Sequence, residues 1–398
     1  MRNLFPADEY AGRRARLTEE LSRQALDLAI VTHVPDIFYL SGTCQASYLF
    51  LNPSGYAWLA VRRGADRTRA ETQLPLEEFA DSAQLSAAVS RNAESALRRV
   101  GLAFDVTRHD TAMRLWKILA RPELVDLGAV FKNLRIIKSP REVELIRLAG
   151  RQLDGAFKTA ASLLRLGQSE LELAIRIEAY LRRKGHPGQV RVRSAGVQPP
   201  VGFILTGAST QPASEFDAMC TGPGLSPAVP LGPGDREFHA GEPVLFDYCG
   251  CCAGYLADES RMLSLGRPPE EASWAYEAMR HVLRRLENQL GPGQVTGQLY
   301  ETALREARIL GYEEQFLNPG RSQLQFVGHG LGLELDEPPF LARGRKESLA
   351  PGMVVAIEPK VLLPGVGVIG VENTYLITAD GYERLTQAEE DWRQVPLD

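Results

Sequence analysis

Apolar residues recur every three or four positions in several segments of the chain, a spacing typical of helices that bury one face. Two of these segments open with the same start signal, Ser139-Pro-Arg-Glu142 and Ser169-Glu-Leu-Glu172. In each, the serine can accept a hydrogen bond from the third helical amide and the glutamate can reach back to the serine. The first predicted helix carries an apolar face made of Val143, Ile146, Ala149, Leu153 and Phe157.

The first third of the chain has a different pattern. An arginine-rich amphipathic segment with Leu17, Leu21 and Ala25 leads into an apolar strand at 26–32, and a second strand-like run covers 56–61. A helix followed by a buried strand is the unit from which α/β domains are built. We therefore expect a smaller α/β domain at 1–128 and a second domain at 129–398.

The second domain carries traces of an internal duplication. The segment from Gly167 to Gly185 has a counterpart at 293–311 with the same glycine spacing. Near the C-terminus, Asp247 follows Gly241 by six residues, and Glu358 follows Gly352 by six residues. Two helix pairs and two acid-bearing hairpins predict a pseudo-twofold α+β domain, with helices packed on a curved sheet and the site at its centre. Prolines and glycines concentrate at 187–243, which predicts loops and short strands that frame the pocket.

Four acids lie where a buried strand should be apolar. Asp247 and Glu358 end apolar runs, whereas Asp258 and Glu372 begin them. Burying an unpaired carboxylate costs several kcal/mol, so these acids are expected to face a cation. His329, in Val-Gly-His-Gly-Leu-Gly, is a fifth candidate ligand. Oxygen ligands with one imidazole suit divalent ions of the manganese, cobalt or zinc type better than copper.

In order and spacing, these five residues resemble the ligands of the pita-bread metallopeptidases, which include prolidase, aminopeptidase P and the metal-free relative creatinase. Asp247 and Asp258 stand eleven residues apart with Gly-Tyr before the return strand, His329 lies in Gly-His-Gly-x-Gly, Glu358 in Ile-Glu-Pro and Glu372 in Val-Glu-Asn-Thr. The resemblance implies a pita-bread domain preceded by a creatinase-type N-terminal domain. It also implies two divalent ions, a homodimer, hydrolysis of a C–N bond, and Glu358 as the general base.

Three positions depart from the family pattern. Asp336 stands where the peptidases carry a second histidine, Leu231 where they carry a histidine between proline and glycine, and Gly370 where prolidase-like members tend to have an arginine. The resemblance assigns these positions to substrate binding or catalysis. Asp336 either binds a substrate amine or shuttles a proton, or it is a turn residue before Glu-Pro-Pro. Losing a donor to a developing oxyanion commonly costs about 2.7–4 kcal/mol of transition-state stabilisation.

Three functions therefore stay open. The first is a dinuclear metallohydrolase of small peptides with Xaa-Pro preference. The second is a metal-dependent hydrolase of a small non-peptide amide or amidine, which the departures favour. The third is a non-catalytic binding protein on the same fold, although relatives of that kind usually lose the metal ligands and this chain keeps five.

Composition narrows the setting. A net charge of −5 with interspersed signs gives no basic stripe, so nucleic acid is not an expected partner. No apolar run approaches the roughly 18 residues of a membrane span, and the polar start lacks the apolar core of a signal peptide, so we expect a cytoplasmic protein. The five cysteines are an odd number and are expected to be reduced. Cys249 and Cys251 share strand parity with Asp247, and are either close to the ions or small buried residues of the hairpin.

Overall fold

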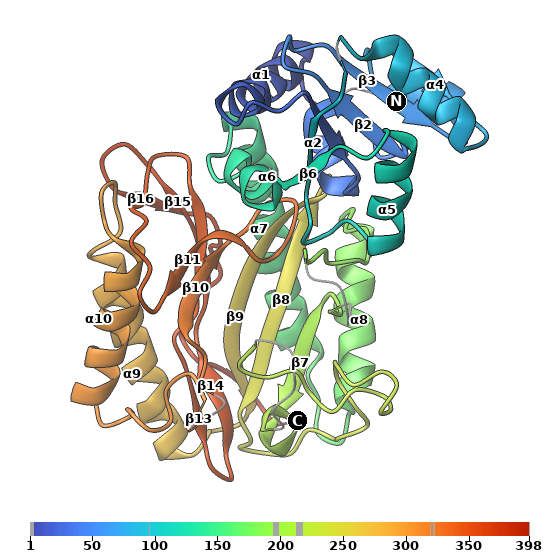
Figure 1. The fold of residues 1–398 in the computed structure, drawn as a ribbon. Helices are drawn as coiled ribbons and strands as arrows, with labels where there is room; N and C mark the ends of the chain where they lie inside the picture. Colours follow the sequence, from blue (N-terminus) through green and yellow to red (C-terminus); the bar gives the residue numbers. More distant parts are fainter. Residues whose placement is uncertain are drawn as a thin grey trace. The chain divides into compact units, whose positions relative to one another are not determined.

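The computed structural model describes residues 4–94, 96–193, 199–211, 218–318, 320 and 323–397 (Figure 1). The chain forms two compact units, Met1–Arg135 and Ile136–Asp398. Among the described residues, no helix is both long enough and apolar enough to cross a membrane.

The N-terminal unit is built on one mixed sheet with the strand order β4-β3-β2-β1-β5-β6. Its centre is apolar because every residue of β1, β2 and β3 is buried. The strands are β1 (Leu28–Val31), β2 (Tyr48–Leu51), β3 (Ala57–Val61), β4 (Leu76–Glu78), β5 (Arg99–Leu102) and β6 (Glu123–Asp126). The helices are α1 (Ala7–Arg23), α2 (Val34–Ser41), α3 (Ala65–Glu71), α4 (Ser82–Asn92), α5 (His109–Ile118) and α6 (Gly128–Leu134).

Two details of this unit differ from the sequence pattern. Leu17 and Leu21 are buried on α1, but Ala25 lies beyond the helix, exposed and in the left-handed region with φ 51°. The division between the units lies at Arg135/Ile136, whereas the sequence suggests 128/129. The residues between the two boundaries belong mainly to α6, which packs against α1 within the N-terminal unit.

The helices of the C-terminal unit begin where their capping signals predict. Both α7 (Pro140–Leu163) and α8 (Glu170–Arg183) have complete capping boxes, formed by Ser139 with Glu142 and by Ser169 with Glu172. The five apolar residues predicted for the first helix are all buried. The second helix pair is α9 (Glu270–Glu287) and α10 (Thr296–Ile309).

The duplication extends to backbone geometry. Gly167 and Gly185, which flank α8, have φ of 73° and 95°, and their counterparts Gly293 and Gly311, which flank α10, have φ of 86° and 84°. These left-handed conformations favour glycine because a side chain would meet the backbone there. Each pair therefore marks one copy of the same glycine-bounded helix.

Two sheets form the interior of the C-terminal unit. One has the order β17-β9-β8-β7 and contacts α7 and α8, and the other has the order β11-β10-β12-β15-β16 and contacts α10. In Figure 1 the helix pairs cover opposite outer faces of this unit, with the sheets between them. The strands are β7 (Gly202–Thr206), β8 (Val244–Cys252), β9 (Tyr255–Leu265), β10 (Phe326–Gly330), β11 (Glu337–Ala342), β12 (Val354–Ile357), β13 (Lys360–Leu363), β14 (Gly367–Gly370), β15 (Asn373–Ile377), β16 (Tyr382–Arg384) and β17 (Arg393–Val395).

The two acid-bearing segments occupy corresponding places in the sheets. β8 and β9 form a continuous antiparallel hairpin. β12 and β15 also pair antiparallel, but the small hairpin β13–β14 is inserted between them. The two sheets meet at an antiparallel bridge between Ser260 and Glu372. The α+β pita-bread prediction is confirmed, and the bridge places both acid pairs at the seam between the sheets.

Candidate metal centre

All five predicted ligands line one pocket of the C-terminal unit. Asp247 comes from β8, Asp258 from β9 and His329 from β10. Glu358 directly follows β12, and Glu372 directly precedes β15. The four carboxylates, called the acid cluster below, therefore come from both copies of the duplicated design.

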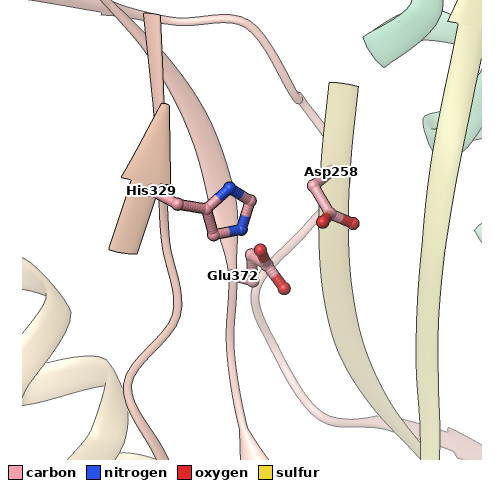
Figure 2. Close-up of side chains that lie close together, drawn as sticks. All are labelled: Asp258, His329 and Glu372. Carbon is pink, nitrogen blue, oxygen red and sulfur yellow. The ribbon is translucent and has the colours of Figure 1, made fainter. Parts of the chain in front are cut away.

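Three of the five residues are close enough to share one ion. Ligand atoms of Asp258, His329 and Glu372 lie within 4.8 Å of one another, and all three residues are buried. Figure 2 shows their side chains directed toward a common point. Two carboxylates and an imidazole suit a divalent ion such as manganese, cobalt or zinc.

Neighbouring groups fix the orientation of these three side chains. The Ser260 hydroxyl donates to Glu372 Oε2 at 2.7 Å, and the Glu259 backbone N–H donates to Asp258 Oδ1 at 3.1 Å. His329 Nδ1 lies 3.0 Å from the Leu335 carbonyl oxygen, which can only accept, so Nδ1 carries the proton. This tautomer leaves Nε2 with a lone pair for a metal.

One oxygen of the cluster lacks a protein partner. Glu372 Oε1 is buried and has no hydrogen-bond partner among the described residues. Burial, together with the nearby Glu372 and Asp247, raises the pKa of Asp258 well above its usual range. Unpartnered buried carboxylate oxygens are costly, and a divalent ion would satisfy them. The residues present therefore fit one ion at Asp258, His329 and Glu372.

Lys360, which the sequence analysis did not single out, lies inside the acid cluster. Its Nζ is 2.9 Å from Asp247 Oδ2, 2.9 Å from Glu358 Oε2 and 3.0 Å from Glu372 Oε2. Burial lowers the pKa of this ammonium, but the three carboxylates outweigh burial and hold the pKa well above its usual range. A usable signal was present, because Lys360 stands two residues after Glu358 and side chains at i and i+2 of an extended chain share a face.

A second buried cation supports the cluster from behind. The fully buried Arg261 donates to the Glu372 carbonyl oxygen at 2.6 Å and to Asn373 Oδ1 at 2.7 Å. It also pairs with the buried Glu259 at 3.2 Å. Arg261 thus ties β9 to the start of β15 and fixes the backbone that presents Glu372.

The three departures lie in different surroundings. Asp336 lines the pocket, with Oδ1 3.6 Å from His329 Nδ1 and its side chain 44% exposed. Leu231 is buried in the main apolar cluster together with Met219 and Cys220, which line the pocket. Gly370 pairs with Lys360 across the β13–β14 hairpin. Leu231 and Gly370 are not among the pocket-lining residues of the described chain.

The structure distinguishes the two cysteines. Cys249 lines the pocket, and its thiol lies 3.6 Å from Asp258 Oδ1. Both cysteines belong to a small apolar cluster with Val190 and Leu256. Cys249 is therefore a packing residue that also lies next to the candidate ion site, whereas Cys251 does not line the pocket.

The proline- and glycine-rich segment frames the pocket as expected. It supplies β7 and several lining residues, among them Pro199, Pro200, Phe203 and Met219. Residues 194–198 and 212–217 of the same segment lie outside the described residues. The apolar side chains on this wall give a small substrate a surface that is partly hydrophobic.

Comparisons with known proteins agree with this architecture. The model of metallopeptidase family M24 matches residues 144–379, and that of the creatinase/prolidase N-terminal domain matches residues 13–137. The chain is 24% identical to the Xaa-Pro dipeptidase of Pyrococcus horikoshii, covering 94% of this chain and 97% of the relative. It is 26% identical to the Xaa-Pro dipeptidase of Lactobacillus helveticus, covering 68% of this chain and 66% of the relative.

Solved structures show the same fold. The Xaa-Pro dipeptidase from Bacillus anthracis superposes with a TM-score of 0.82 at 21% identity, covering 96% of this chain and 99% of that one. The prolidase from Pyrococcus horikoshii has a TM-score of 0.80 at 23% identity, with the same coverage.

Proposed function

Because the chain belongs to metallopeptidase family M24, we propose that it is a metal-dependent hydrolase of small peptides, with Xaa-Pro dipeptides as the first candidate substrates. The observation that carries this proposal is the convergence of Asp258, His329 and Glu372 on one point inside a pocket. Relatives named Xaa-Pro dipeptidase, which span nearly the whole chain, support the substrate class.

The proposed roles follow from the geometry. Asp258, His329 and Glu372 would hold a divalent ion of the manganese, cobalt or zinc type. Such an ion lowers the pKa of water and polarises an amide carbonyl. The family resemblance implies two ions held by all five residues, with Asp247 among the ligands. The close grouping of Asp258, His329 and Glu372 supports one ion.

Glu358 is the proposed general base. Its Oε2 accepts from Lys360, while its Oε1 lies 3.8 Å from His329 Nε2, on the side where a ligand of His329 would sit. A carboxylate in that place can take a proton from a water and deliver it to the leaving nitrogen. Asp336 stands at the pocket wall on the other side of the imidazole, where a substrate amine or N–H would meet a negative charge.

Metal content and peptide hydrolysis test this proposal together. Purified protein loaded with Mn²⁺ and freed of excess ion should retain metal and hydrolyse Xaa-Pro dipeptides. Asp258→Ala and Glu372→Ala should lose both properties. The matched control is Asp235→Ala, an exposed acid of the same unit, which should keep both. Unchanged metal content in the two site variants would reject the assignment of the ligands.

A small non-peptide amide or amidine is the second candidate substrate. It is favoured because Leu231 and Gly370 offer no side-chain donor at positions where the resemblance expects a histidine and an arginine. The two candidates separate in one screen of Xaa-Pro dipeptides, longer Xaa-Pro peptides and cyclic amidines. A protein that binds metal and turns over none of these would instead fit the non-catalytic alternative.

The proposal extends to cellular setting and assembly. Cys220, Cys249, Cys251 and Cys252 are free thiols, which supports a reducing compartment such as the cytoplasm. A homodimer is what the family resemblance implies, and sedimentation velocity of the full chain tests it. A single species at the mass of one chain, 43.8 kDa, would contradict the dimer.

A further inference from the structure

Lys360 is enclosed as a bound cation would be. Three carboxylates from three different segments, those of Asp247, Glu358 and Glu372, each place one oxygen 2.9–3.0 Å from its Nζ. An ammonium has three hydrogens, so this arrangement satisfies every donor of the lysine. The side chain is 2% exposed, so solvent contributes little to its solvation.

The other metal-ligand atoms of the site are not used by Lys360. Asp258 and His329 are not among the hydrogen-bond partners of Lys360, and within the described part of the chain the second oxygen of Glu372, Oε1, has no hydrogen-bond partner. Glu372 thus divides its two oxygens, with Oε2 toward the lysine and Oε1 available to an ion. The acid cluster contains two neighbouring positions for positive charge, and Lys360 fills one of them.

The backbone makes room for the lysine stem. Lys360 and Gly370 are directly paired in the β13–β14 hairpin. A Cβ at position 370 would lie 2.8 Å from the Lys360 Cβ and closer still to its Cγ. Any side chain at 370 would therefore displace the stem that carries the ammonium into the cluster. Packing of the Lys360 stem therefore explains why position 370 is a glycine and not the arginine that the resemblance leads one to expect.

The two kinds of cation exclude each other at this position. Manganese and zinc bind carboxylate oxygens at about 2.0–2.2 Å. A second ion held among Asp247, Glu358 and Glu372 would lie close to the ammonium that these carboxylates already surround, at a distance where two positive charges repel strongly. Burial of Lys360, the packing of its stem on Gly370 and its three carboxylate partners hold the ammonium in this position.

We propose that the Lys360 ammonium is a built-in counter-ion that replaces one of the two expected metal ions, so that this chain binds a single divalent ion through Asp258, His329 and Glu372. The proposal rests on the proposed function only for the presence of that one ion. It narrows the candidate chemistry to a mononuclear metallohydrolase, in which Asp247 anchors Lys360 and does not ligate metal.

Metal stoichiometry tests the proposal. Wild-type protein and two variants are loaded with Mn²⁺, desalted and measured for manganese per chain by mass spectrometry. The wild type should hold one equivalent, and Lys360→Ala, which frees three carboxylates and the space between them, should hold two. Lys346→Ala, an exposed lysine of the same unit, should hold one.

Electron paramagnetic resonance of the same samples provides a readout independent of activity. The wild type should give the six-line spectrum of an isolated Mn²⁺ ion, and Lys360→Ala the broadened spectrum of a coupled pair. If Lys360→Ala does not fold, the wild-type spectrum alone decides, because a coupled pair there overturns the proposal and an isolated ion supports it.

The outcomes separate this proposal from the function on which it rests. Two equivalents in the wild type overturn the role of Lys360 and leave the metallohydrolase intact. One equivalent in both wild type and Lys360→Ala also overturns it, because the lysine would then not be what excludes the second ion. No manganese in the wild type rejects the ion site itself, and with it the proposed function.

Discussion

The carboxylate of Asp336 borders the pocket on one side and solvent on the other, with 44% of its side chain exposed. It lies 3.6 Å from the protonated nitrogen of His329, so its charge favours an imidazole that donates from Nδ1. Position and charge thus give Asp336 two ways to affect the reaction, through the substrate and through the orientation of a ligand.

Asp336→Asn keeps the size of the side chain and removes its charge. We expect kcat/KM to fall at least tenfold, which corresponds to about 1.4 kcal/mol of transition-state stabilisation. Asp336→Glu, which keeps the charge, should retain more activity than Asp336→Asn. Steady-state kinetics of the three proteins measures this, and a fall of less than about threefold in Asp336→Asn would leave Asp336 as a turn residue.

His186, which follows α8, is buried. Its side chain is 3% exposed and Nδ1 accepts from the Gly188 backbone N–H at 2.9 Å. Burial, with a further contribution from Arg182, lowers the pKa of His186 from 6.5 to about 4. As the pH falls from 6.5 to 4, the unfolded chain takes up a proton that the folded chain does not, so folding stability is lost across that window.

The measurable consequence is a steeper acid destabilisation than in a variant without this ring. From pH 7 to pH 5 the His186 contribution amounts to about 2 kcal/mol of unfolding free energy. Between pH 7 and pH 5, the unfolding free energy of His186→Gln, measured by urea denaturation, should fall by about that much less than the unfolding free energy of the wild type. The exposed His239→Gln serves as the control, and an unchanged pH dependence in His186→Gln would contradict the prediction.

The residue chemistry of the site was partly visible in the sequence. The five ligand candidates could be found because their spacing and order follow from two strand pairs that carry acids in place of apolar residues. Lys360 was missed because a single lysine at the start of a strand usually points to solvent; its spacing from Glu358 was a signal, and the pairing with Gly370 shows how its stem is accommodated. Under the proposal made above, the number of bound metal ions depends on the direction of the Lys360 side chain.

Elements pack in the C-terminal unit through close backbone approaches as well as side chains. Gly250 of β8 faces α7, and a Cβ at this position would lie 2.8 Å from the carbonyl carbon of Ala149 and closer still to its oxygen. The α7–β8 contact therefore depends on the absence of a side chain. It supports the strand that carries Asp247.

Gly250→Ala should force α7 away from β8. We expect a loss of about 1–3 kcal/mol of unfolding free energy, the range found when extra methyl groups are inserted into packed interiors. Gly381→Ala, at a glycine with open space around it, should change stability by less than about 0.5 kcal/mol. Urea denaturation of both variants compares them, and equal stabilities would show that α7 yields without cost.

The elements themselves were the most predictable level. Both capping boxes start their helices at the expected residues because the signal is local and needs no tertiary partner. Ala25 was placed on a helix that ends at Arg23, since an apolar period cannot show where a chain turns into the left-handed region. The β13–β14 insertion also escaped notice, because it interrupts the second acid-bearing hairpin without changing its acids.

The five candidate metal ligands of the molecule all belong to its C-terminal unit. Among the described residues, the group of potential ligands is confined to the C-terminal unit. The duplication could be predicted because glycine spacing survives in both copies, each with left-handed glycines at the same places. How the two copies share the work of forming the site could not be predicted, since corresponding positions of the two copies carry different side chains.

Ion binding should therefore stabilise the two units unequally. At 100 times its dissociation constant, Mn²⁺ adds about 2.7 kcal/mol to the stability of the state that binds it. Hydrogen exchange should slow in β8, β9 and β15 and stay unchanged in β1–β3. Glu372→Ala should show no Mn²⁺ effect, and slowing spread equally over both units would contradict a site confined to one.

The enclosure of Lys360 also bears on how the chain matures. Four carboxylates gathered at a seam would repel one another in a newly made protein that has not yet met an ion. An ammonium supplied by the same chain offsets part of that repulsion as soon as β13 and β14 pair. If Lys360 has the proposed role, the C-terminal unit should fold before it meets a metal ion and take up that ion afterwards.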